Sequence, residues 1–282
     1  MWIIGIVIVL MLYFSTFAIE KSLRTIQKQN EEVIILLHGG GLSWWNYQEV
    51  AELLQKRYHV ILPILNGHAG SDKHFLSIED NANDIITFID GHYDGTVLAI
   101  GGLSLGGQIL VEMLSQRKDI CKYAIIESAL VVPMKITHKL IRPIFGMSYG
   151  LIKQKWFSKL QFYFLKIRKE LYCHYYEDTC KIGKSDMISF LEANSDYYRN
   201  ESINDTIAHT YIIVGSKEQR KMIVSANMLH KAIKNSQMKI IEGYYHGEMS
   251  MNHAKEYVNL LEKFMGKSDG TERFGYEEKD KF

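Results

Sequence analysis

Short apolar runs alternate along this chain with segments of helical periodicity, and this alternation constrains the fold more than any other feature of the sequence. The runs that we expect to form strands cover residues 33–37, 60–65, 96–100, 123–126, 210–214 and 238–241. The segments with helical spacing or composition cover residues 44–58, 77–89, 108–116, 220–233 and 254–265. Because strand–helix alternation with short connections is typical of parallel sheets, we predict an α/β fold with a mainly parallel sheet and helices on both faces.

The alternation stops over residues 130–204, which are helical in character and rich in aromatic side chains such as Trp156. We therefore expect one core formed by residues 20–129 and 205–265, into which residues 130–204 are inserted as a helical cap. Residues 266–282 are charged and have no periodicity, so we expect them to form a flexible tail.

Residues 1–19 contain no charged side chain. As a helix, such a run reaches about 27 Å, close to the thickness of a bilayer's hydrocarbon core, so we expect a membrane anchor. Lys21, Arg24 and Lys28 follow the run, and the positive-inside rule then places the rest of the chain in the cytoplasm. The alternative is a soluble cytoplasmic protein in which this run, rich in Ile and Val, supplies strands to the sheet.

Composition excludes several classes of function. Lys and Arg number 33 against 32 Asp and Glu, a net charge of +1 that argues against a nucleic-acid partner. Cys121, Cys173 and Cys180 are too few for a disulfide framework, and none forms a C-x-x-C pair. No cluster has the spacing of zinc ligands, so we expect no metal and no cofactor, and nothing in the sequence indicates an obligate protein partner.

The sequence Gly102-Leu103-Ser104-Leu105-Gly106 matches the pattern G-x-S-x-G. It directly follows a predicted strand and directly precedes a predicted helix. A strand-to-helix turn this tight holds its central residue in strained backbone angles, and the small glycines allow the turn to close. The placement therefore predicts that the Ser104 hydroxyl is exposed at the N-terminus of a helix as a nucleophile.

A serine nucleophile needs a base, and the base needs a carboxylate that holds its tautomer. His246 follows the last predicted strand and precedes the last helix, which makes it the candidate base. Glu218 lies four residues after another strand and is the candidate acid. Glu127, at the end of the strand predicted over residues 123–126, is the alternative acid. For the remaining histidines near these motifs, we expect structural roles for His38, His68 and His253.

Four motifs in this order resemble the α/β-hydrolase superfamily over residues 33–265. His38-Gly39-Gly40-Gly41 is similar to the family's oxyanion loop, and Gly67-His68-Ala69-Gly70-Ser71 to its G-H-G-x-S turn, with Ala69 in place of a glycine. The Ser104 motif and the late His246 complete the set. The resemblance implies Ser104 as nucleophile, His246 as base and Glu218 as acid, with the N–H groups of Leu105 and of Gly40 or Gly41 holding the oxyanion.

The sequence departs from the family pattern in two places. The acid is Glu where Asp is more common, and because some members carry the acid after an earlier strand, Glu127 stays open. The family also has two strands before the oxyanion loop, but only residues 20–32 are available for them if residues 1–19 are an anchor. We therefore expect either a shortened sheet or strands drawn from residues 1–19.

The resemblance implies a serine hydrolase that cleaves an ester or related acyl bond, and the aromatics of the cap suit an apolar or lipid-like small molecule as substrate. Carbon–carbon bond hydrolases and thioesterases share the scaffold, and a non-enzymatic ligand sensor on the same fold is the alternative from another class. Residues 131–170 carry nine Lys and Arg and a single acid, Glu170. Such a segment is either a solvated helix surface or a face that lies against an anionic lipid leaflet.

Overall fold

The computed structural model describes residues 23–26 and 32–266, and within them a seven-stranded sheet in the order β1-β3-β2-β4-β5-β6-β7. Its strands are β1 (Leu23–Ile26), β2 (Val33–Leu37), β3 (His59–Pro63), β4 (Val97–Leu103), β5 (Cys121–Glu127), β6 (His209–Gly215) and β7 (Ser236–Ile241). Strands β2 to β7 are parallel, and β1 pairs antiparallel with β3 at the edge. The predicted α/β class and mainly parallel sheet are confirmed.

Strand β4 runs further than the sequence predicted, to Leu103 instead of residue 100. Gly101 and Gly102 have the composition of a turn, yet they pair with Leu36 and Leu37 on one side and with β5 on the other. Backbone pairing with β2 and β5 holds these glycines in an extended conformation, so the strand continues to the residue before Ser104.

The start of the chain was expected to give either a shortened sheet or strands from residues 1–19. Strand β1 lies between that uncharged run and β2, so residues 20–32 do supply a strand. The predicted anchor over residues 1–19 and the predicted tail after residue 266 lie outside the described residues. Within residues 23–26 and 32–266, no helix has the length and apolar character needed to cross a membrane.

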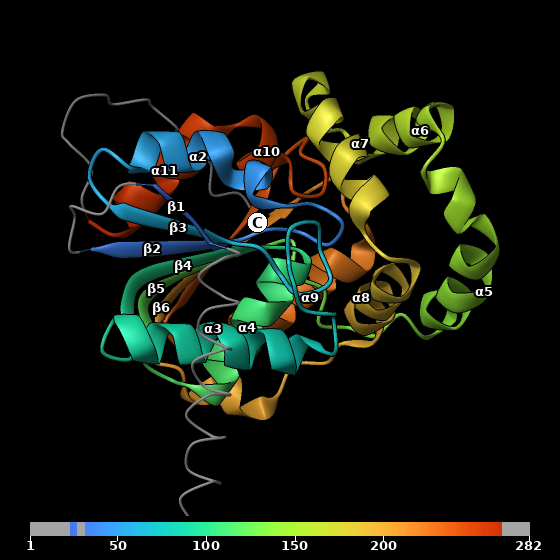
Figure 1. Cartoon of the computed structure of the whole chain (residues 1–282). Coiled ribbons are helices and arrows are strands. Elements are labelled where there is room, and N and C mark those ends of the chain that lie inside the picture. The colour runs from blue at the N-terminus through green and yellow to red at the C-terminus, as the bar shows by residue number, and fades with distance from the viewer. Residues whose placement is uncertain (1–22, 27–31, 267–282) are drawn as a thin grey trace, which may run out of the picture.

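Helices cover both faces of the sheet (Figure 1). Those of the core are α2 (Gln48–Leu54), α3 (Ile78–His92), α4 (Leu105–Gln116), α9 (Arg220–Ala232), α10 (Glu248–Asn252) and α11 (Ala254–Phe264), with 3-10 turns at Trp44–Tyr47 and Glu201–Asp205. Helices α3, α4 and α9 lie below the sheet in this view, and α2, α10 and α11 lie above it. Strand β2 contributes side chains to both faces of the sheet. Ile35 packs in the apolar layer with α3, α4 and α9, and Ile34 and Leu36 pack in the layer with α2, α10 and α11.

Between β5 and β6 the chain leaves the sheet and forms α5 (Lys135–Ile152), α6 (Lys155–Leu165), α7 (Tyr172–Lys181) and α8 (Lys184–Asp196), with a 3-10 turn at Lys169–Leu171. We call residues 130–204 the helical insertion. In Figure 1 its helices stand beside the ends of the strands that carry the site described next, with α5 and α6 farthest from the sheet.

Candidate active site

Ser104 occupies the turn between β4 and α4 and has φ 53° and ψ −112°, a conformation that L-residues rarely adopt. The turn is fixed on both sides, because the Ser104 N–H donates to the carbonyl of Glu127 at 2.9 Å and the Gln108 N–H donates to the carbonyl of Ser104 at 2.9 Å. The strained, tightly bonded turn is the local structure that the G-x-S-x-G pattern predicts.

Two glycines of the motif are required by close backbone contacts. A Cβ on Gly102 would lie 2.3 Å from the carbonyl oxygen of Gly106, and a Cβ on Gly106 would lie 2.2 Å from that of Leu37. No side chain fits at either distance without a backbone shift. The motif thus packs against the end of β2, immediately before the glycine loop at residues 39–41.

His246 and Glu218 lie in direct contact. Nδ1 of His246 is 2.7 Å from Oε2 of Glu218. The Glu218 side chain is only 1% exposed, whereas that of His246 keeps 45% of its surface accessible. With Nδ1–H donating to the carboxylate, the other ring nitrogen is left as the basic atom.

The contact shifts the pKa of both partners. Burial favours neutral His246, but the hydrogen bond to Glu218 and the negative charges of Glu218 and Glu127 outweigh it and raise the pKa of His246. Burial also opposes ionisation of Glu218, but the bonds from His246, the Gly215 N–H and the Ser128 hydroxyl lower its pKa. Glu218 is therefore ionised across the neutral range and stabilises a protonated imidazole.

Sequence reasoning missed Ser128. Its hydroxyl donates to Oε1 of Glu218 at 2.7 Å, and the Gly215 N–H donates to the same oxygen at 2.7 Å. Ser128 follows β5 directly with φ 55°, and its own N–H donates to the carbonyl of Ile213 in β6. The contact between Ser128 and Glu218 forms because the ends of β5 and β6 lie side by side. A serine at this position in the sequence does not by itself indicate that contact.

The structure brings the Ser104 and His246 segments together through their neighbours. Gly247, next to His246, has φ 67°, and a Cβ there would lie 2.8 Å from Cδ1 of Leu103, next to Ser104. Within the described residues, no hydrogen bond joins the Ser104 hydroxyl to His246. Such bonds are often long in unliganded enzymes and shorten when substrate binds.

Glu127 does not hold His246. It is 2% exposed, and its Oε1 accepts a hydrogen bond from the Ser250 N–H at 3.3 Å, on the side of the buried Tyr47 and Tyr257. Burial raises the pKa of Glu127 to about 7. Of the two candidate acids, only Glu218 contacts the imidazole.

The contacts of the glycine loop separate the two alternatives, Gly40 and Gly41, that were expected to share the oxyanion with Leu105. The Gly41 N–H already donates to Nε2 of His68 at 3.0 Å, and the Gly39 N–H donates to Oδ1 of Asn46 at 3.0 Å. Among the described residues, the Gly40 N–H has no such partner. The bond to His68 therefore removes Gly41 from the candidate donors and leaves Gly40 beside Leu105, whose N–H at the first helical position has no intrahelical acceptor.

His38 and His68 both brace this loop, a role that the sequence predicted for His38, whereas His68 was expected only to stabilise its own turn. Nε2 of His38 accepts from the Leu65 N–H at 3.1 Å, while its Nδ1 lies 2.9 Å from the carbonyl of Gly39. Burial lowers the pKa of His38 to about 3 and that of His68 to about 4. Because each Nε2 accepts from a backbone N–H, both rings are neutral with the proton on Nδ1.

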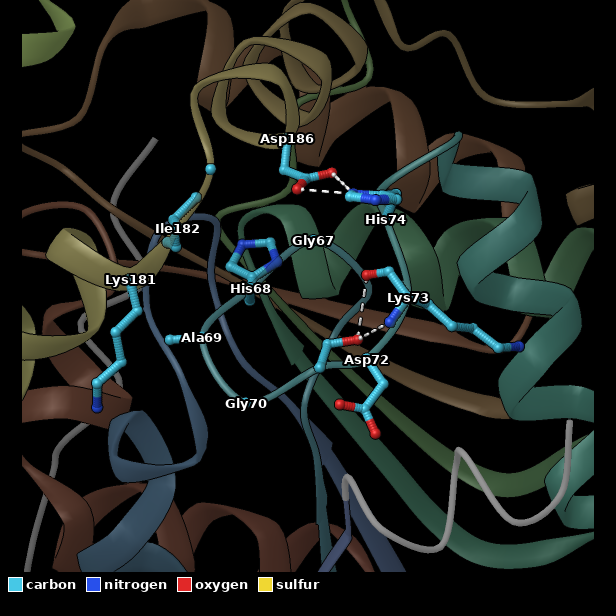
Figure 2. Close-up of a pocket in the computed structure, with 12 residues that line it drawn as sticks. Gly67, His68, Ala69, Gly70, Asp72, Lys73, His74, Lys181, Ile182 and Asp186 are labelled. Carbon is cyan, nitrogen blue, oxygen red and sulfur yellow. Dashed lines mark hydrogen bonds and ion pairs between the residues drawn. The ribbon is translucent and has the colours of Figure 1, made fainter. Parts of the chain in front are cut away.

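A pocket of about 140 Å³ lies where the turn containing His68 meets the loop between α7 and α8. Figure 2 shows His74 and Asp186 facing each other across its rim, with Nδ1 of His74 3.1 Å from a carboxylate oxygen of Asp186. Within the described residues, no group of three or more His, Cys, Asp or Glu side chains is placed to hold a metal ion.

A protein-family model described as the alpha/beta hydrolase fold matches residues 32–168, the part of the chain that contains the glycine loop, the Ser104 turn and the start of the insertion. The chain has the α/β-hydrolase fold. A search of curated proteins finds no significant match.

Solved α/β-hydrolase structures resemble the whole described core. MenH from S. aureus matches with a TM-score of 0.70 at 16% identity, covering 87% of this chain and 98% of that one. A thermophilic esterase from Thermogutta terrifontis matches with a TM-score of 0.70 at 15% identity, covering 86% and 94%. A meta-cleavage product hydrolase from Pseudomonas fluorescens IP01 matches with a TM-score of 0.67 at 17% identity, covering 88% and 94%. At these identities the likeness shows the fold alone.

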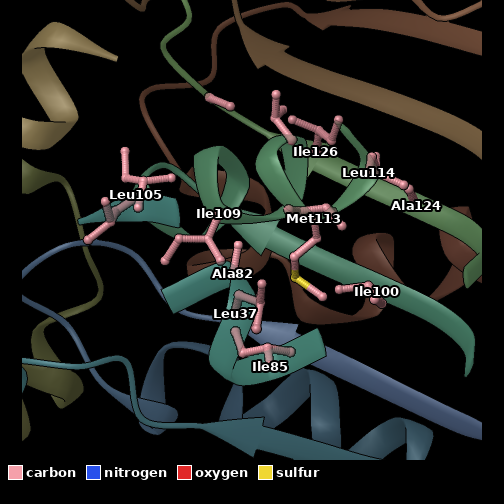
Figure 3. Packing of buried hydrophobic residues seen from close by; sticks show 14 of the residues in the cluster. Leu37, Ala82, Ile85, Ile100, Leu105, Ile109, Met113, Leu114, Ala124 and Ile126 are labelled. Atoms are coloured by element: carbon pink, nitrogen blue, oxygen red, sulfur yellow. The ribbon is translucent and has the colours of Figure 1, made fainter. Parts of the chain in front are cut away.

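The α/β-hydrolase core holds the insertion beside the Ser104 helix. Gln108 of α4 donates to the carbonyls of Leu130 and Asn194, and the Asn194 amide donates back to Gln108. Figure 3 shows α4 packed through Leu105, Ile109 and Met113 in the apolar core, a rigid base for the turn. Phe190 of α8 stacks on His68 with ring centroids 4.5 Å apart, which places an aromatic ring of the insertion against the glycine loop.

Proposed function

We propose that the protein is a serine hydrolase that cleaves an ester or related acyl bond through Ser104, His246 and Glu218. The 2.7 Å contact between His246 and Glu218 carries the proposal, because it lies after β7 and β6, at the same end of the parallel strands as the Ser104 turn after β4. In this scheme the Ser104 hydroxyl attacks the substrate carbonyl as His246 takes its proton. The ionised carboxylate of Glu218 stabilises the imidazolium and does not take up the proton itself.

The Gly40 and Leu105 N–H groups are the proposed donors to the oxyanion of the tetrahedral intermediate. His246 then protonates the leaving alcohol, and the acyl group stays on Ser104. Water attacks this acyl-enzyme with His246 again as base, which releases the acid and restores Ser104. Phe190 of α8 is buried against Gly40, so the insertion reaches the glycine loop, which supports its role as a cap over the substrate. The aromatic composition of this cap favours a small apolar or lipid-like substrate.

A fluorophosphonate probe tests the nucleophile. Wild-type protein should be labelled, Ser104→Ala should not be, and Ser115→Ala, a change on the same helix away from the turn, should be labelled like wild type. No labelling of wild type, or equal labelling of Ser104→Ala, contradicts the proposal.

A panel of acyl esters and thioesters of increasing chain length, with a vinylogous diketone for carbon–carbon cleavage, tests the reaction class. Turnover of esters supports the proposal, and preferential turnover of either other substrate reassigns it. Ligand binding without any turnover identifies the protein as a sensor.

We also propose, from the sequence pattern alone, that residues 1–19 attach the protein to a membrane with the catalytic domain on the cytoplasmic side. Alkaline carbonate extraction of membranes should leave the full chain in the pellet. Release into the supernatant contradicts an anchor and favours the soluble alternative.

A further inference from the structure

Helix α5 is apolar on two opposite sides. Ile141 and Ile152 are buried, and Phe145 and Tyr149 pack against the core. The other side is exposed and bears Ile136 (79% exposed), Leu140 (48%), Ile144 (52%), Met147 (90%) and Leu151 (42%). At about 100° per residue these exposed side chains fall within an arc of about 80°, a continuous stripe that turns away from the protein.

Helix α6, which follows α5, also exposes large apolar side chains. Its exposed side chains are Trp156 (62%), Leu160 (48%), Tyr163 (65%), Phe164 (68%) and Leu165 (40%). The two helices contact each other and lie at the end of the insertion away from the sheet (Figure 1). We call these exposed residues of α5 and α6 the outer apolar surface. Contiguous exposure of this kind marks an interaction site, whereas scattered apolar side chains do not.

Basic side chains border the outer apolar surface. Residues 131–170 hold nine Lys and Arg and one acid, while the whole chain has a net charge of only +1, so the rest of the chain is net acidic. Two of the nine are paired, Arg142 with Glu192 and Arg168 with Glu49. In the part of the chain that the structure describes, no ion pair is found for Lys135, Lys139, Lys153, Lys155, Lys159 and Lys169.

We propose that the outer apolar surface docks on an anionic lipid bilayer. Its apolar side chains would enter the headgroup–acyl boundary, with Trp156 and Tyr163 at interfacial depth and the bordering lysines among anionic headgroups. A basic amphipathic surface of this composition matches such a leaflet in both polarity and charge. A second copy of the chain matches it poorly, because a two-fold contact would bring the two basic borders together.

The docked surface leads to the active site. Nζ of Lys166, at the end of α6, lies 4.3 Å from the ring centroid of Tyr163 and 5.7 Å from that of Tyr245, the neighbour of His246. Asn252 fastens this segment by donating to the Lys166 carbonyl and accepting from the Arg168 N–H. On the proposed function, on which this step rests, a lipid-like ester would reach Ser104 from the bilayer side of the insertion.

Vesicle flotation of the full chain tests the docking without any substrate, so its result is independent of the proposed activity. The vesicles are phosphatidylcholine alone and an equimolar mixture with phosphatidylglycerol. We expect Met147→Glu combined with Trp156→Glu to lower partitioning onto the mixed vesicles about tenfold or more. Ile207→Glu combined with Leu76→Glu, the matched double change at residues that are 58% and 73% exposed and outside the insertion, should bind like wild type.

A second set of variants tests the contribution of the bordering lysines to binding. Lys139→Gln with Lys159→Gln should lower partitioning onto the mixed vesicles about tenfold or more and leave binding to phosphatidylcholine unchanged. Lys118→Gln with Lys231→Gln, an equal loss of charge elsewhere, should have a smaller effect. Brominated lipid should quench a component of the tryptophan fluorescence that Trp156→Phe removes.

Two outcomes overturn the proposal. In the first, all variants partition like wild type, so that binding resides in residues 1–19. In the second, the glutamate variants abolish a concentration-dependent self-association seen by sedimentation velocity and leave vesicle binding intact, so that the surface is a contact between copies.

Discussion

Ser128 donates a 2.7 Å hydrogen bond to Oε1 of Glu218, the carboxylate oxygen that His246 does not contact. With the Gly215 N–H on the same oxygen, this bond fixes the carboxylate from the side opposite the imidazole. Glu218 is therefore held by two strand ends, and its second oxygen is aimed at Nδ1 of His246.

Removing the Ser128 hydroxyl should lower kcat/KM by about 10- to 100-fold, because a hydrogen bond to a buried charge contributes about 1.5–3 kcal/mol. Ser128 has φ 55°, so Ser128→Ala keeps a strained backbone while Ser128→Gly relieves it. Equal losses of activity in the two variants, measured on the same ester, assign the effect to the hydroxyl. Full activity in Ser128→Gly would assign it to the backbone.

The sequence predicts much of the fold because hydrophobic periodicity and Gly-rich turns are local signals. The strand-to-helix turn at Ser104 and the position of His246 after the last strand were both recognisable from their neighbours in the chain. The role of Ser128 was not, and neither was the bond that takes the Gly41 N–H away from substrate. Both depend on contacts between segments distant in sequence, which no single residue encodes.

Activity should rise with pH through the pKa of His246, because only the neutral imidazole can accept the Ser104 proton. Since Glu218 raises that pKa above its usual 6.5, the midpoint of kcat/KM against pH should lie above 6.5 in wild type. Glu218→Gln should move the midpoint to lower pH and reduce kcat by about 10²–10⁴. The control is Glu242→Gln, an exposed change in the loop that carries His246. An unmoved midpoint in Glu218→Gln would show that the Glu218 carboxylate does not act on His246.

Gly106→Ala should prevent folding or destabilise it by about 3 kcal/mol or more, because the new Cβ would lie 2.2 Å from the Leu37 carbonyl oxygen. Gly91→Ala in α3 is the matched control, since nothing lies within 4 Å of its Cβ position. The control should raise stability by about 0.5 kcal/mol through helix propensity. Thermal unfolding measures both changes, and a native-like melting temperature for Gly106→Ala would contradict the packing argument.

His68→Phe should lower kcat about tenfold without moving the pH midpoint. The ring keeps its contact with Phe190, but the Gly41 N–H loses its acceptor and the glycine loop its brace. The pKa of His68 is about 4, so this residue does not titrate between pH 5 and 9. A midpoint that moves in His68→Phe would mean that His68 shares the titration assigned to His246.

Glu127 gives the protein a pH-dependent stability. Burial raises its pKa from about 4.5 to about 7, so the folded state holds this proton more tightly than the unfolded chain. Its contribution is therefore full below pH 4.5 and is lost as the pH rises to about 7, a change of about 3 kcal/mol. The groups around it are Glu218, His246, Ser250, Tyr47 and Tyr257.

Glu127→Gln keeps an oxygen for the Ser250 N–H but cannot ionise. Relative to wild type, its free energy of unfolding in urea should be higher at pH 8 than at pH 5 by about 2–3 kcal/mol, because the wild-type contribution is lost over this range. Glu201→Gln, at an exposed position, should show the same small difference at both pH values. A difference for Glu127→Gln that does not depend on pH would mean that Glu127 is ionised in the folded protein throughout this range.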